Sequence, residues 1–189
     1  VQIILLDTRT FRDNLVLNHN EPLYQNDYKP NLSPDSTLLG KEQWHWLEQT
    51  LKIPADLRII ASSIQFSHAY NGYESWTNIP HERERMAKLI KTTGANGVVF
   101  ISGDVHWGEI SKLDIPDQYP IYDITSSGIT QTWDEPMHNK NRIGNVVMEN
   151  NFGLIVINWE HPVTLSMQII DINNTLRTVH SIELNKLSY

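Results

Sequence analysis

The residues best suited to chemistry lie at the end of one apolar run. Val98–Ile101 is a β-prone stretch that leads through Ser102 and Gly103 to Asp104 and His106. Loops that follow the carboxyl ends of buried strands hold the active sites of many mixed α/β sheets. A carboxylate and an imidazole two residues apart in such a loop suit a divalent metal ion or an iron centre. In the alternative interpretation, Asp104 is an ordinary turn residue and His106 is structural.

A second loop of the same kind follows another predicted strand, Leu57–Phe66. It carries His68, Asn71 and Trp76, and Gly72 permits a tight turn within it. Active sites of α/β proteins form where such loops converge. We therefore treat this loop as the second candidate, in which His68 or Asn71 supplies a ligand or contacts a substrate.

Charged residues also follow the first predicted strand, Val1–Leu6. Asp7, Arg9 and Arg12 lie directly after it. Arg suits bidentate binding of phosphate, so Arg9 is a candidate substrate contact. The alternative, which we favour from the sequence, is an ion pair between Asp7 and Arg9 or Arg12 that organises the loop.

Hydroxyl groups end the strand predicted within Tyr119–Gly128. Thr125, Ser126 and Ser127 are able to donate hydrogen bonds to a phosphoryl oxygen, or equally to satisfy backbone groups of the turn. The sequence has no Gly-x-Ser-x-Gly motif, so neither Ser126 nor Ser127 is predicted to be a nucleophile.

The spacing of apolar residues predicts a helix over Gly40–Leu51, with Gln43 placed to help cap its start. The apolar residues on one face of this helix are Trp44, Leu47 and Leu51. Residues 13–38, which precede it, show no periodicity and are predicted to form a long surface loop.

A second helix is predicted to begin near Asn78, an N-cap candidate close to Pro80, and to end at Gly94. The charged run Glu82–Arg85 is interpreted as its solvated face. The apolar residues that form its buried stripe are Met86, Leu89 and Ile90.

The last third of the chain is predicted to contain strands only. Residues 131–150 are polar and irregular, and three strand-like segments follow, near 151–159, 163–172 and 176–184. We expect an antiparallel meander that closes one sheet. Strands and helices that alternate through residue 128 and are followed by strands alone indicate a single α/β domain over residues 1–189.

Composition narrows the functional classes. The chain has 189 residues, 40% of them hydrophobic and 20% charged, with no cysteine and a net charge of −7. The acidic balance and the lack of a basic block argue against nucleic acid as a partner. Disulfides and thiolate ligands are excluded. No apolar run approaches the ~18 residues of a membrane span.

Several motifs resemble those of the PhoD-like alkaline phosphatases, a branch of the calcineurin-like metallophosphoesterases. Ser102–Trp107 is similar to the family's GDVH signature, and Leu6–Arg12 to its L-D-T-R-x-[YF]-R segment. Further similar segments are Leu39–Leu47, the P-x-E-R-x-R motif at 80–85, Asn71–Trp76 and Asp123–Gly128. The resemblance implies the C-terminal portion of a two-sheet α/β/β/α sandwich.

The resemblance also implies an activity, namely hydrolysis of phosphate mono- or diesters by metal-activated water. Divalent metal or iron would be the cofactor, as Fe3+ with Ca2+, or Mn, Zn or Mg. Asp104 and His106 would be metal ligands, with His106, Asn71 and His68 as catalytic candidates. The candidate substrate contacts are Arg9, Trp76 and Ser126. Asn71 departs from the family pattern, which has His at that position.

The resemblance covers only the later part of the family's pattern. The early metal-ligand motifs of the superfamily do not occur here, so we expect that an N-terminal half exists elsewhere and that this chain alone has little activity. No signal peptide is recognisable, and a periplasmic or secreted location is expected from the resemblance alone. Two rival interpretations are a metal-dependent nuclease of the same fold and a non-catalytic metal- or partner-binding module.

Overall fold

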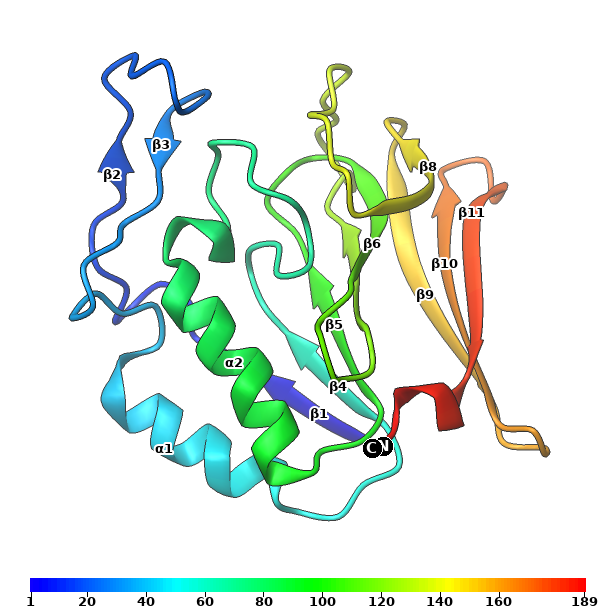
Figure 1. The fold of residues 1–189 in the computed structure, drawn as a ribbon. Helices are drawn as coiled ribbons and strands as arrows, with labels where there is room; N and C mark the ends of the chain where they lie inside the picture. Colours follow the sequence, from blue (N-terminus) through cyan, green and yellow to red (C-terminus); the bar gives the residue numbers. More distant parts are fainter.

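A six-stranded mixed sheet forms the middle of the computed structural model, which describes residues 1–189 (Figure 1). The strand order is β1-β4-β5-β7-β6-β8; the first four strands are parallel, and β6 and β8 are antiparallel to their neighbours. Its strands are β1 (Gln2–Leu5), β4 (Arg58–Ala61), β5 (Val98–Ser102), β6 (Gly108–Leu113), β7 (Ile121–Ser126) and β8 (Arg142–Val147).

Two helices cover one face of this sheet (Figure 1). The prediction for α1 (Gly40–Leu51) is confirmed, because its bounds and its three buried residues are those expected. Helix α2 (Pro80–Thr93) ends, as predicted, at Gly94, whose left-handed φ of 63° a glycine adopts without strain. Neither helix has the length and apolarity needed to cross a membrane.

The predicted caps of both helices are wrong. Gln43 bonds the Asp7 backbone through both ends of its amide, so it ties α1 to the loop after β1 and does not cap α1 with its side chain. Asn78 instead closes the short 3-10 helix η1 (Trp76–Asn78), where it accepts from the Ser75 backbone N–H at 2.6 Å. A second 3-10 helix, η2 (Leu184–Leu187), lies near the chain end.

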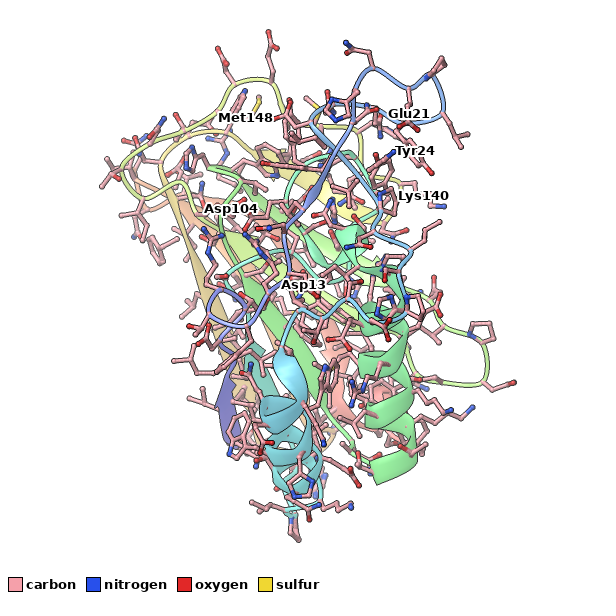
Figure 2. The ribbon with its side chains drawn as sticks, turned by 90° about the vertical axis from the view of Figure 1, so that its left-hand side faces the viewer. Asp13, Glu21, Tyr24, Asp104, Lys140 and Met148 are labelled. Atoms are coloured by element: carbon pink, nitrogen blue, oxygen red, sulfur yellow. The ribbon has the colours of Figure 1, made fainter.

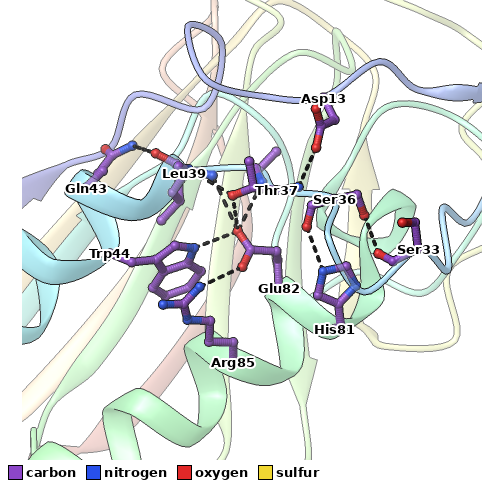
Figure 3. Close-up of polar contacts among 12 residues, drawn as sticks. Asp13, Ser33, Ser36, Thr37, Leu39, Gln43, Trp44, His81, Glu82 and Arg85 are labelled. Carbon is purple, nitrogen blue, oxygen red and sulfur yellow. Dashed lines mark hydrogen bonds and ion pairs between the residues drawn. The ribbon is translucent and has the colours of Figure 1, made fainter.

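The predicted solvated face of α2 is also wrong at Glu82, which is buried between the two helices (Figure 3). Its Oε2 accepts hydrogen bonds from Trp44 Nε1 at 2.6 Å, from Thr37 Oγ1 at 2.9 Å and from the Leu38 N–H at 3.0 Å. Burial raises the pKa of Glu82, but these donors outweigh it, so the net pKa is lowered. The carboxylate therefore joins α2 to α1 and to the loop before it.

A three-stranded antiparallel sheet packs against the opposite face of the six-stranded sheet. The predicted pairing of the last three strands is confirmed, although they form a sheet of their own, in the order β11-β10-β9. The sheets approach closely at Gly108, where an added Cβ would lie 2.8 Å from Ile169. The mixed α/β class predicted from the sequence is thus confirmed. The strands are β9 (Asn151–Asn158), β10 (Thr164–Asp171) and β11 (Leu176–Glu183).

The second sheet covers only part of that face. On the edge strand β1, Ile4 is buried toward the helices, whereas Ile3 and Leu5 are 73% and 75% exposed on the opposite side. These side chains, with Ile101 of β5 and Phe152 of β9, line an apolar groove of about 640 Å3. The groove separates the exposed half of the sheet from β9.

Two strands of the main sheet were not predicted. In β6, the buried Glu109 and Ser111 interrupt the apolar pattern, and β8 lies in the segment interpreted as irregular. The long loop at 13–38 is confirmed, apart from a short ladder between β2 (Val16–Leu17) and β3 (Tyr28–Lys29).

Candidate functional site at the carboxyl ends of the parallel strands

The loops that follow β1, β4, β5 and β7 meet at one edge of the main sheet, and those after β4 and β5 are the two that we expected to converge. The Thr8 and Ser63 hydroxyls hydrogen-bond each other, which joins the loop after β1 to the loop after β4. Ser127, after β7, accepts from the His106 N–H at 2.9 Å. Asp104 lies beyond the strand ends, among these loops (Figure 2).

The turn after β5 has an unusual backbone. Asp104 and His106 both adopt left-handed conformations, with φ of 79° and 61°, whereas Gly103 does not. Two residues that carry side chains, and not the neighbouring glycine, therefore adopt the strained φ. Such conformations persist where surrounding contacts enforce them, and they cluster at functional sites. Here the His106 carbonyl accepts from the Trp133 N–H at 3.1 Å, which helps to hold the turn.

The charges near Asp104 differ from those predicted. Arg9 and Arg12 both pair with Glu74 and not with Asp7. Asp7 instead accepts the backbone N–H groups of Arg9 and Thr10, each at 2.9 Å, because its short side chain suits a local turn. Glu74 thus brings the two guanidinium groups to the loop that precedes η1.

Asp104 is exposed to solvent, but its surroundings disfavour the ionised form of its carboxyl group. Burial of part of its side chain, and then the charge of Glu74, raise the pKa of Asp104. Arg9, His106 and Arg12 act in the opposite direction. A bound cation would remove this penalty on the ionised form.

Two adjacent rings of the same turn carry buried polar atoms without partners. Nδ1 of His106 and Nε1 of Trp107 are both buried and form no hydrogen bond. A buried unsatisfied polar atom costs about 1–3 kcal/mol and calls for an explanation. A role of the His106 imidazole as a metal ligand would explain the first atom. A hydrogen bond from Trp107 Nε1 to a substrate would explain the second.

The residues of this chain do not form a complete metal site. Asp104 and His106 are suitable donors for a borderline or hard metal ion. However, no group of three or more His, Asp or Glu side chains lies close enough together to hold one. A metal at this position would therefore need further ligands.

A cavity of about 140 Å3 opens beside Asp104. Aromatic residues form much of its wall, and they come from β3, from the two candidate loops and from the segment between β7 and β8. His106 is not among the lining residues. The aromatic and acidic residues that line it are Tyr28, Tyr73, Trp107, Trp133, Glu74, Asp104 and Glu135.

Three residues of the second candidate loop are not accessible. His68 is 1% exposed with neither ring nitrogen bonded, and burial lowers the pKa of His68 to about 4. Trp76 is fully buried in the core and donates to Ser62 Oγ at 3.0 Å. Asn71 is also buried and accepts from the Tyr73 N–H at 3.0 Å. All three side chains are packed inside the protein, and their roles as ligands or substrate contacts stay predictions.

Ser126 faces away from the cavity beside Asp104. Its hydroxyl donates to Asn151 Oδ1 at 2.8 Å, and its side chain lines the apolar groove described above. Glu74 and Trp133, which line the cavity beside Asp104, were not predicted from the sequence. Glu74 lies in a segment that had been singled out, whereas Trp133 lies in an irregular stretch that gave no signal.

Comparisons with known proteins agree with these motifs. Residues 1–163 match the family described as PhoD-like phosphatase. Alkaline phosphatase D of Bacillus subtilis (strain 168) is 36% identical over 121 residues, which is 59% of this chain and 20% of that protein. A solved structure described as "Structure of PhoD" has a TM-score of 0.74 at 22% identity and covers 98% of this chain and 40% of that one. The chain thus spans well under half the length of either relative.

Proposed function

The chain belongs to the PhoD-like phosphatase family, and on that premise we propose that it is part of an enzyme that hydrolyses phosphate esters. The observation that carries this proposal is the left-handed turn at Asp104–His106, where a carboxylate and an imidazole with a buried, unbonded nitrogen follow a central strand. Four strand-end loops meet at this turn, which is the usual place for chemistry in such sheets.

In this proposal, Asp104 and His106 are metal ligands, and His106 alternatively orients the nucleophile from beside the metal. The metal is a divalent ion or iron, such as Fe3+ with Ca2+, or Mn, Zn or Mg. Its remaining ligands come from outside these residues, because this chain supplies too few. We also propose that Arg9 contacts a phosphoryl oxygen, because it is the more exposed of the two guanidinium groups bound to Glu74.

The apolar groove supports the proposal that residues 1–189 are the C-terminal part of a larger α/β/β/α sandwich. Three layers are present in this chain, and the exposed half of the main sheet offers a surface for further strands. β1 carries apolar side chains on both sides, a pattern typical of strands buried on both faces. The remaining N-terminal half is the partner that we expect on this surface. The periplasmic or secreted location rests on family resemblance alone.

Substitutions at the turn in the longer protein test the assignment. Asp104→Asn and His106→Ala should each lower the bound metal and reduce hydrolysis of p-nitrophenyl phosphate by roughly 100-fold or more. Asp114→Asn is the matched control, since Asp114 is an exposed residue directly after β6 that is paired only with Lys112. Unchanged metal content in His106→Ala would instead favour the non-catalytic binding module.

A second substrate separates the remaining alternatives. Bis(p-nitrophenyl) phosphate, a diester, distinguishes a phosphodiesterase or nuclease from a monoesterase. The net charge of −7 disfavours a nuclease, because a polyanionic substrate would meet repulsion outside the site. We therefore expect small phosphate esters to be better substrates than DNA.

A further inference from the structure

The cavity beside Asp104 has a wall that suits a positive charge. Of its nine lining residues, four are aromatic, three are acidic and none is Lys, Arg or His. Aromatic faces attract cations through their quadrupole, most strongly when the cation is shielded from water. The composition therefore favours an organic cation over an anion or a neutral group.

The aromatic wall is built from four separate segments that are held together. Tyr28 of β3 is fixed to the second loop by a hydrogen bond from its N–H to Gly72 O at 2.8 Å. The Tyr73 and Trp133 rings lie 6.3 Å apart at 50°, so they are inclined to each other, as neighbouring sides of a cage are. Trp107 closes the inner end and is only 4% exposed.

The three acidic residues of the cavity differ in whether their negative charge is already paired. Glu74 is paired with Arg9 and Arg12, and Asp104 belongs to the proposed metal site. Glu135 forms no ion pair or hydrogen bond and is exposed at the cavity rim beside Trp133. It is thus the carboxylate free to attract a cation.

We propose that this cavity binds the alkylammonium group of a phosphate ester, of the choline or ethanolamine type, while its phosphoryl group lies at Asp104. The volume of 140 Å3 is close to the ~150 Å3 of an apolar cavity that holds benzene, so a trimethylammonium group fits. The inference deepens the proposed function and depends on it for the phosphate ester. Recognition of the cation does not depend on hydrolysis.

Binding of choline to the purified protein tests the proposal without any turnover. Choline should change the tryptophan fluorescence and titrate to saturation, whereas 3,3-dimethylbutan-1-ol, its uncharged isostere, should bind at least about tenfold more weakly. Trp133→Ala should weaken choline binding by about 5- to 30-fold, the equivalent of ~1–2 kcal/mol for one cation–π contact. Glu135→Gln should weaken it by about two- to fivefold.

Trp46→Ala is the matched control, because Trp46 is an exposed tryptophan on α1, away from the cavity. Equal binding of choline and its uncharged isostere would overturn the proposal, as would unchanged affinity in Trp133→Ala or no choline binding at all. Glu135→Gln alters an exposed residue, so its result does not depend on a change in folding. Choline binding by the longer protein without phosphatase activity would refute the proposed function and leave the cation site standing.

Two ester probes then identify the source of the ammonium group. Soluble glycerophosphocholine and vesicles of phosphatidylcholine present the same cation on a free ester and on a lipid. If Trp133→Ala weakens binding of only one probe, that probe identifies the source of the ammonium group. If it weakens binding of both, the cavity recognises the ammonium group that they share. No Trp133→Ala effect on either would contradict recognition of the ester through this cavity.

Discussion

On one face of the six-stranded sheet, α1 and α2 cover the strands. Even the buried carboxylate of Glu82 accepts hydrogen bonds there, from Trp44, Thr37 and the Leu38 N–H (Figure 3). On the other face, the three-stranded sheet covers one half and leaves Ile3 and Leu5 in solvent. The first face is therefore covered by helices of this chain (Figure 1). The second face ends in an apolar groove, and the candidate site at the strand ends has too few metal ligands. The N-terminal part proposed above would account for both the open groove and the missing metal ligands.

The largest expected effect tests the completeness of the helical face. Glu82→Ala removes the acceptor of Trp44 Nε1, Thr37 and the Leu38 N–H, so it should lower the free energy of unfolding by about 3–5 kcal/mol. Urea unfolding measures this loss. Glu84→Ala, an exposed position on the same helix, should stay within about 0.5 kcal/mol. Equal effects of the two substitutions would mean that the buried carboxylate does not organise this face.

His68 tests the same side of the molecule through pH. Its carbonyl accepts from Arg83 of α2 at 3.0 Å, and burial lowers its pKa to about 4 from a usual 6.5. Between these values the unfolded chain binds a proton that the folded chain does not. Stability is therefore fully present above pH 6.5 and is lost as the pH falls toward 4, by roughly 3 kcal/mol.

Unfolding of the wild type and of His68→Gln between pH 4 and 7 measures this contribution. The variant should lose that part of the pH dependence, whereas His161→Gln, at an exposed histidine, should keep it. The same slope in the wild type and in His68→Gln would show that His68 titrates normally.

The smallest expected effect is that of Leu5→Ser, which sharpens the contrast between the two faces when compared with Ile4→Ala in the same strand. Ile4→Ala, toward the helices, should cost about 2–5 kcal/mol in the free energy of unfolding. Leu5→Ser, one residue later on the exposed side, should change the isolated chain by less than about 1 kcal/mol. In the longer protein, Leu5→Ser should be clearly destabilising. A cost in the isolated chain equal to that of Ile4→Ala would mean that this face is already closed.

The spacing of apolar residues along the chain predicted the helices and strands that are amphipathic or uniformly apolar. Helix α1, the end of α2 at Gly94 and strand β5 follow from apolar spacing and one glycine. Strand β6 was missed because its buried Glu109 is satisfied by Arg142 and Gln65, which are distant in sequence. Burial set by distant partners leaves no periodic trace.

The candidate site shows the same division. The positions of Asp104 and Arg9 at strand ends were readable, because each directly follows an apolar run. The burial of His68 and Trp76 depends on how the whole loop packs, and their chemical type alone suggested an exposed role. Trp133 comes from an irregular segment that is distant from Asp104 in the sequence, so only the fold shows that it lines the cavity.

The most direct test compares the 189-residue chain with the longer protein, side by side, for bound metal and for hydrolysis of p-nitrophenyl phosphate. We predict bound metal and turnover in the longer protein, and neither at an enzyme-like level in the chain alone. Mixing the chain with the separately produced remainder should restore both. Enzyme-like turnover by the chain alone would contradict the claim that its site and its exposed sheet face are completed from outside.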